Sequence, residues 1–267
     1  MKFSDIICPK CGLELHIDGN SLKCNSNHCF DLSSQGYVNL LPPHKQGSIP
    51  GDSKQMARAR RTFLNNGYYK PIADAICDAI SILSPQKIVD IGCGEGYYTG
   101  LLKQSCEADV TGFDISKFAL AYAAKAYNDV SFCVANLHAL PLKDKVADAL
   151  VCCFCAYDAR EFGRVLKDDG RFIFVIPGKR HLFGLKSVLY ENPYENEVDT
   201  AIDGFELERA HELSFDITVN GEDIGNLFAM TPYYWKTPKE GSARLLSLES
   251  LDTEVNVIVC TYKKISL

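Results

Sequence analysis

The sequence has no apolar run approaching the roughly 18 residues that span a membrane, although 46% of its 267 residues are hydrophobic. It also lacks a recognisable signal peptide, because Met1 to Asp5 leads directly into a cysteine motif. Basic charge is not in excess either: the formal net charge is −6, which is unusual for a nucleic-acid-binding protein. These absences predict a cytoplasmic protein. The length suffices for one large α/β core and one further small structural unit.

The 12 cysteines do not indicate a disulfide framework. Eight are scattered through predicted strands and helices, where we expect reduced and mostly buried side chains. The other four form an N-terminal cluster, with Cys8 and Cys11 in one turn and Cys24 and Cys29 in a second turn beside His28. Two tight turns that each present two soft ligands predict a structural zinc site. The spacing alone does not decide whether His28 or Cys29 is the fourth ligand.

The strongest functional signal is a short apolar strand that begins at Lys87, ends in Asp90 and is followed by Gly92, Gly94 and Gly96. Glycines at this spacing allow a sharp turn and a close backbone approach to a ligand, and the next helix offers unpaired N–H groups. Compared with the dinucleotide fingerprint, the third glycine comes one residue early and an acid precedes the first. The pattern therefore favours S-adenosylmethionine over NAD.

Further strand-like segments recur at helix-length intervals, over residues 109–113, 131–135, 148–154 and 171–176. This alternation predicts an α/β fold with a mostly parallel sheet. Asp114, followed by Ile115, ends the second strand and is suited to bind two ribose hydroxyls. Asn136 and Leu137 end the third strand, where an amide and apolar neighbours could hold an adenine. Residues 205–216 and 254–263 predict a final antiparallel hairpin, with residues 230–235 between its strands.

Basic charge is concentrated near the N-terminus. Residues 1–70 carry nine Lys or Arg against five acids, whereas the remainder carries 19 against 29. Arg58, Arg60 and Arg61 fall in a predicted helix from Ser53 to Leu64, with Asp52 or Ser53 as its N-cap. Such a cluster could steer RNA to one edge of the protein. It is equally typical of a solvated helix face.

Several motifs in this order resemble the RlmA family. They are the zinc cluster, residues 36–42, residues 50–53 with 59–64, and the glycine loop over residues 90–98. Members of that family are 23S ribosomal RNA guanine-N1 methyltransferases, and the likeness runs from residue 7 to residue 265. It implies a class I S-adenosylmethionine-dependent methyltransferase fold, Rossmann-like, with a mostly parallel seven-stranded sheet. It also implies a small N-terminal zinc-ribbon-like module and a homodimer that cradles an RNA hairpin.

The resemblance also implies roles for single residues. It makes His28, rather than Cys29, the fourth zinc ligand beside Cys8, Cys11 and Cys24. It assigns cofactor contacts to Tyr69, Gly94, Glu95 and His181, and a role of His181 in removing the guanine proton is a second hypothesis. The expected cofactor-binding residues are Tyr69, Asp90, Gly92, Gly94, Glu95, Gly96, Asp114, Ile115, Asn136, Leu137 and His181.

Three parts are expected: a zinc-binding RNA-recognition module (1–42), a basic helical linker (43–72) and a methyltransferase domain (73–267). Two turns depart from the family pattern. At the surface, Lys167-Asp168-Asp169-Gly170 replaces a Lys-Pro-Gly-Gly turn, and Phe154-Cys155-Ala156 stands where members tend to carry a Tyr-Ala-Pro-like sequence. The second of these turns lies where the methyl acceptor is expected. Aromatic residues that could stack on an unpaired base are Tyr37, Tyr68, Phe154, Tyr233, Tyr234 and Trp235.

Three functions are compatible with the sequence. The favoured one is guanine-N1 methylation of 23S ribosomal RNA, since a small-molecule enzyme needs neither a zinc module nor a basic helix. A small-molecule methyltransferase is the first alternative, and a non-catalytic zinc-dependent RNA binder is the second. The sequence does not indicate which of two neighbouring guanines would be the target.

Overall fold

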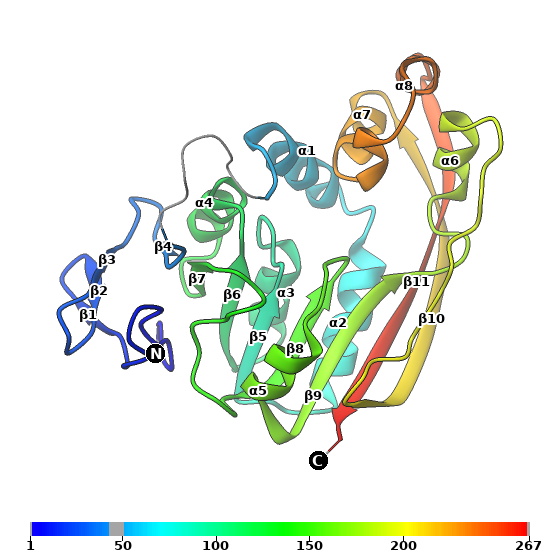
Figure 1. The fold of residues 1–267 in the computed structure, drawn as a ribbon. Helices are drawn as coiled ribbons and strands as arrows, with labels where there is room; N and C mark the ends of the chain where they lie inside the picture. The colour runs from blue at the N-terminus through cyan, green and yellow to red at the C-terminus, as the bar shows by residue number, and fades with distance from the viewer. Residues whose placement is uncertain (1, 43–50, 266–267) are drawn as a thin grey trace.

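The computed structural model describes residues 2–42 and 51–265. Its centre is a sheet of eight strands in the order β10-β11-β9-β8-β5-β6-β7-β4 (Figure 1). Strands β4 to β9 pair in parallel, whereas β11 is antiparallel to both β9 and β10. The strands are β4 Val38–Asn39, β5 Lys87–Ile91, β6 Asp109–Asp114, β7 Ser131–Val134, β8 Ala147–Cys153, β9 Leu166–Pro177, β10 Phe205–Asn220 and β11 Ser250–Lys264.

Each face of this sheet has its own hydrophobic core, because side chains alternate along a strand. In β8, Ala149 and Val151 belong to one core, and Leu150 and Cys152 to the other. The first core includes side chains from α1 (Lys54–Asn65), α2 (Lys70–Ser81), α3 (Tyr97–Ser105), α4 (Lys117–Ala126), α6 (Phe183–Leu189), α7 (Glu222–Ala229) and α8 (Lys239–Leu246). The second includes side chains from α5 (Ala159–Val165) and from the N-terminal residues.

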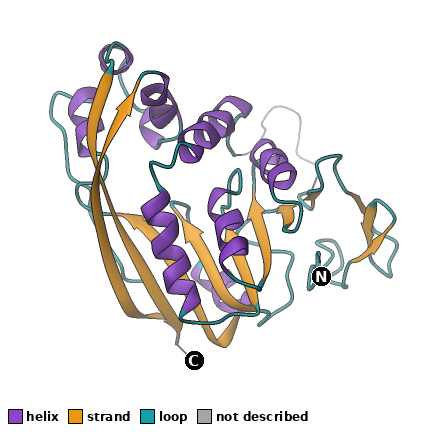
Figure 2. Ribbon diagram, turned by 180° about the vertical axis from the view of Figure 1, so that it is seen from behind, coloured by secondary structure: helices purple, strands orange, loops and turns teal. Residues whose placement is uncertain are grey.

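The N-terminal residues form a small antiparallel sheet of β1 (His16–Asp18), β2 (Ser21–Lys23) and β3 (Cys29–Asp31), beside the β7 end of the large sheet (Figures 1 and 2). Ile6 and Leu22 are buried in the same core as β8. Strand β4 then pairs with β7, with Val38 opposite Cys133. The large sheet therefore has one strand more than the seven predicted, and the module shares its core with the methyltransferase sheet.

The predicted helix from Ser53 to Leu64 is present as α1. Ser53 is its N-cap, because its Oγ accepts a hydrogen bond from the Met56 N–H at 3.2 Å. The predicted antiparallel pair is β10 with β11, and the segment between them folds into α7, the 3₁₀ helix η1 (Pro232–Trp235) and α8. Of the expected linker 43–72, residues 43–50 lie outside the described residues. Within the described residues, no helix is both long and apolar enough to cross a membrane.

A buried ammonium fastens the N-terminal residues to the start of β5. The Lys87 side chain is 9% exposed and its Nζ lies 2.7 Å from Asp5 Oδ2. The same Nζ donates to the Ser4 carbonyl at 3.0 Å and to Ser4 Oγ at 2.9 Å. Lys87 is therefore a polar link between the module and the central strand.

We expect Lys87→Met to lower the free energy of unfolding by about 1–3 kcal/mol, because Asp5 and the Ser4 carbonyl lose a charged donor in a water-poor place. Urea denaturation followed by circular dichroism measures the change. Lys125→Met, at an exposed position of α4, is the matched control and should change stability by about 0.5 kcal/mol or less. An equal loss in both variants would remove the stabilising role of the Lys87 contacts.

Candidate active site and metal site

The glycine loop joins β5 to α3 at the carboxyl end of the parallel strands, where open α/β sheets bind ligands. Gly92 has a φ of +71°, and a Cβ there would lie 2.4 Å from Cys155 Sγ. Gly96, the N-cap of α3, has a φ of +88°, and its Cβ would lie 2.8 Å from the Ala123 Cβ. At Gly94 the nearest atom to such a Cβ is Arg60 Nη1, 3.5 Å away. Neighbouring atoms thus leave no room for a side chain at Gly92 or Gly96, whereas Gly94 faces Arg60 of α1.

Three carboxyl groups surround this loop. Asp90 accepts a hydrogen bond from Thr99 Oγ1 at 2.6 Å, and burial raises its pKa to about 7. Burial likewise raises the pKa of Glu95 to about 7, against the opposing charge of Arg60. Asp114 accepts from the Gly94 N–H at 2.9 Å, and burial raises its pKa too. Buried carboxylates of this kind are stabilised by a cationic ligand, and S-adenosylmethionine carries a sulfonium and an ammonium.

The predicted strand-end residues lie on the same face of the sheet, and each is two positions beyond the residue that pairs with the preceding one. Asp90 pairs with Gly112 across β5 and β6, and Asp114 pairs with Val134 across β6 and β7. Ile115 follows Asp114 and is 37% exposed. Asn136 is exposed after β7, where its Oδ1 accepts from the His138 N–H at 3.1 Å, and Leu137 beside it is half-buried.

Phe154, His181 and Tyr69 form an aromatic wall at the carboxyl end of β8. Phe154, directly after β8, adopts a left-handed φ of +53° and stacks on His181, with ring centroids 5.3 Å apart. Tyr69 lies 6.2 Å from both rings. His181 is 7% exposed, and its buried Nδ1 has no hydrogen-bond partner among the described residues. Burial lowers the pKa of His181 to about 4, so the imidazole is neutral at pH 7.

The three arginines of α1 do not share a common environment. Arg60 forms an ion pair with Asp52, with Nη1 and Oδ2 2.7 Å apart. Arg61 stacks over Tyr122, with its guanidinium carbon 5.2 Å from the ring centroid. Arg58 is exposed. The helix therefore presents Arg58 to solvent, whereas Arg60 and Arg61 contact residues outside α1.

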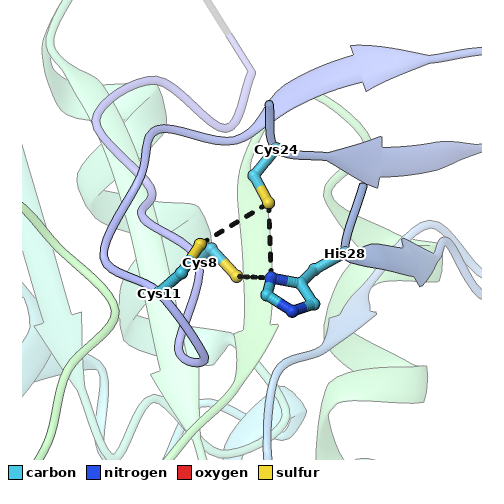
Figure 3. Close-up of side chains that lie close together, drawn as sticks. All are labelled: Cys8, Cys11, Cys24 and His28. Atoms are coloured by element: carbon cyan, nitrogen blue, oxygen red, sulfur yellow. Dashed lines mark hydrogen bonds between the residues drawn. The ribbon is translucent and has the colours of Figure 1, made fainter. Parts of the chain in front are cut away.

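The N-terminal ligand candidates come together in one group (Figure 3). One side-chain atom from each of Cys8, Cys11, Cys24 and His28 lies within 4.8 Å of the others. His28 Nδ1 is 3.4 Å from Cys8 Sγ and 3.5 Å from Cys24 Sγ. Cys29 is exposed in β3 and is outside this group. Three thiolates and one imidazole suit tetrahedral zinc, and four protein ligands leave no open position for catalysis.

Two family models match the chain: a methyltransferase domain over residues 89–174 and the RlmA N-terminal region over residues 6–48. YxjB of Bacillus subtilis, whose name describes a 23S rRNA (guanine-N1) methyltransferase, is 32% identical over 96% of this chain and 95% of its own length. The chain belongs to the RlmA family. A 23S rRNA (guanine(748)-N(1))-methyltransferase of Streptomyces fradiae is 28% identical over 91% of each chain. A demethylmenaquinone methyltransferase of Thermotoga maritima is 32% identical, but over only 38% of this chain.

As in the RlmA family, the cofactor is S-adenosylmethionine and the metal is structural zinc. The glycine loop, the buried acids and the thiol group fit these two. Sequence reasoning missed two contributors: Thr99, which bonds Asp90, and Asp52, which bonds Arg60. Thr99 lies on α3, after the glycines, and the sequence pattern alone does not show which way its side chain points. Asp52 carries no motif signal beyond its suitability as an N-cap.

We expect the purified protein to contain a single zinc ion that Cys24→Ser loses, because removal of one thiolate opens the four-ligand set. Mass spectrometry of the metal content and the thermal midpoint measure the change. The matched control is Cys29→Ser, which alters the exposed neighbouring cysteine and should keep the ion. Zinc retention in Cys24→Ser together with loss in Cys29→Ser would contradict the ligand set seen in the fold.

We expect Glu95→Gln to stabilise the cofactor-free protein at pH 8. The pKa of Glu95 rises from 4.5 to about 7 on folding, so the folded chain binds more protons between these values and loses stability as pH rises through them. The variant should gain about 1–3 kcal/mol at pH 8 and almost nothing at pH 4. Denaturant titration at both pH values measures this, and Glu107→Gln, the same substitution at an exposed position, is the matched control. A constant difference between Glu95→Gln and wild type would refute the linkage.

Proposed function

We propose that this protein transfers a methyl group from S-adenosylmethionine to N1 of a guanine in a hairpin loop of 23S ribosomal RNA. The observation that carries the proposal is the thiol-rich module built into the edge of a methyltransferase sheet. Relatives named for this reaction match the chain through both parts. A module with its own metal site offers a second surface for a large substrate, which a small acceptor would not need.

The carboxyl ends of β5, β6 and β7 are proposed to hold the cofactor. In this assignment Asp114 accepts hydrogen bonds from the ribose hydroxyls, and Asn136 with Leu137 and Ile115 surrounds the adenine. Asp90 and Glu95 balance the positive charge of the ligand. When bound, S-adenosylmethionine supplies a methyl group on a sulfonium, which needs no further activation by the protein. The remaining proposed contacts are Tyr69, Gly92, Gly94, Gly96 and His181.

The acceptor guanine is proposed to stack beside Phe154, which is 40% exposed and already stacked on the His181 ring with an interplanar angle of 28°. A base that leaves its loop needs a flat apolar surface of this kind. The left-handed backbone at Phe154 aims its ring at His181, so the Phe154-Cys155-Ala156 turn that departs from the family pattern still provides an aromatic platform. Catalysis then depends mainly on holding N1 in line with the methyl group.

His181 is assigned to positioning rather than to proton removal. An effective general base has a pKa near the working pH, whereas burial lowers the pKa of His181 to about 4. Its unpartnered Nδ1 can instead accept a hydrogen bond from the cofactor or the base. The group that takes the N1 proton is not assigned.

RNA contact by α1 is assigned to Arg58, because Arg60 and Arg61 already contact Asp52 and Tyr122. The module over residues 1–42 is proposed as the RNA-recognition part, the segment 43–72 as the linker and residues 73–267 as the catalytic domain. A cytoplasmic homodimer is proposed from the family resemblance. The small-molecule alternative is disfavoured because the matching demethylmenaquinone enzyme aligns with only 38% of the chain.

The test is methyl transfer from tritiated S-adenosylmethionine to 23S ribosomal RNA that lacks the modification. We expect label in the RNA and 1-methylguanosine among its nucleosides after digestion. Asp114→Asn should lower turnover at least tenfold through weaker cofactor binding, and the exposed Asp129→Asn is the matched control. The absence of label in the RNA would reject the proposed substrate. If the protein nevertheless binds S-adenosylhomocysteine, that result would favour a small-molecule methyltransferase or a non-catalytic RNA binder.

A further inference from the structure

Helix α1 follows the N-terminal module in the sequence, and one of its arginines, Arg60, faces the glycine loop. Ala59, Phe63 and Leu64 bury one side of the helix. This fixes the rotation of α1, and the intervening Arg60 points toward the glycine loop, with Nη1 3.5 Å from the Cβ position of Gly94. Its side chain is 29% exposed, so a ligand can reach it.

Arg60 faces a group of acids. Its charge lowers the pKa of both Glu95 and Asp114, against the larger effect of burial. It pairs directly with Asp52 at 2.7 Å, and its Nη2 lies 3.4 Å from the Met230 carbonyl. Within the described part of the chain, the guanidinium thus forms a direct ion pair with one carboxylate, that of Asp52, and its charge also acts on the carboxyl groups of Glu95 and Asp114.

The amino-acid end of S-adenosylmethionine carries both an ammonium and a carboxylate. Acids around the glycine loop can receive the ammonium, but they repel the carboxylate. A carboxylate in a water-poor site needs N–H donors, and the planar fork of arginine matches its two oxygens. Backbone N–H groups at the start of α3 can share this role, but they carry no full charge. Among the side chains in these contacts, Arg60 carries the positive charge that a carboxylate requires.

We propose that Arg60 binds the carboxylate of the methionine portion of the cofactor, and that Asp52 occupies the guanidinium until the cofactor replaces it. The inference rests on the cofactor site proposed above. It reassigns Arg60 from RNA contact to cofactor contact. It also makes α1 the element through which the N-terminal module and the cofactor are connected, because Arg60 lies on its second turn and Asp52 directly precedes its N-cap, Ser53.

The test compares two ligands that differ by one group: S-adenosylhomocysteine and its decarboxylated form, which lacks only the carboxylate. Titration calorimetry gives the affinity of each for the full-length wild type, Arg60→Met and Arg58→Met. We expect Arg60→Met to weaken S-adenosylhomocysteine about 10- to 100-fold, the range for a hydrogen bond to a charged group. The decarboxylated ligand should lose less than about threefold, and the exposed Arg58→Met should leave both affinities unchanged.

A second variant tests the exchange with Asp52 and does not depend on the folding of Arg60→Met. Asp52→Asn removes the competing carboxylate, so it should tighten S-adenosylhomocysteine several-fold and leave the decarboxylated ligand unchanged. Equal losses of both ligands in Arg60→Met, or no tightening in Asp52→Asn, would overturn the inference and make the ion pair structural. Failure of wild type to bind either ligand would instead reject the proposed cofactor site itself.

Discussion

The parallel register of β5, β6 and β7 is the constraint on which the rest of the molecule depends. Backbone pairing places the ends of these strands in one row, so that Asp90, Asp114 and Asn136 follow one another along a single edge. A slip of one residue in either pairing would turn these side chains to the opposite face. The glycine loop and the buried acids take their positions from this edge.

Burial shifts the pKa values of the acids and of the histidine in this site in opposite directions. It raises the pKa of Asp90 and Glu95, which favours a positively charged ligand, and it lowers the pKa of His181, which keeps the imidazole neutral. The same exclusion of water therefore prepares one side of the site for charge and the other for a flat, uncharged ring. This division agrees with a sulfonium donor and a nucleobase acceptor.

The sequence predicted most of the sheet because its signals are local. Alternating apolar segments, the glycine spacing and the Ser53 cap each depend on neighbouring residues, and the fold class was confirmed. It did not reveal β4, because a pair of residues such as Val38 and Asn39 has no strand pattern of its own and is extended only by pairing with β7. The direction of Arg60 was equally hidden, since the Arg58-Ala59-Arg60-Arg61 run reads as a solvated face until Phe63 and Leu64 fix the helix rotation. The spacing of the cysteine motif left His28 and Cys29 open, whereas the family resemblance pointed to His28. The turn geometry agrees, because it brings His28 rather than Cys29 into the thiol group.

The attachment of the N-terminal residues also determines the order in which the chain can complete its structure. The Phe3 N–H bonds Ser131 Oγ at 2.7 Å, across 128 positions of sequence, and Ile6 bridges to Leu142. Such distant contacts close late, because the entropy of a long loop must be overcome first. During synthesis the module therefore emerges well before the strand that receives it, and its metal is what can hold it together in the meantime. The ion is thus as much an aid to assembly as a part of the finished protein.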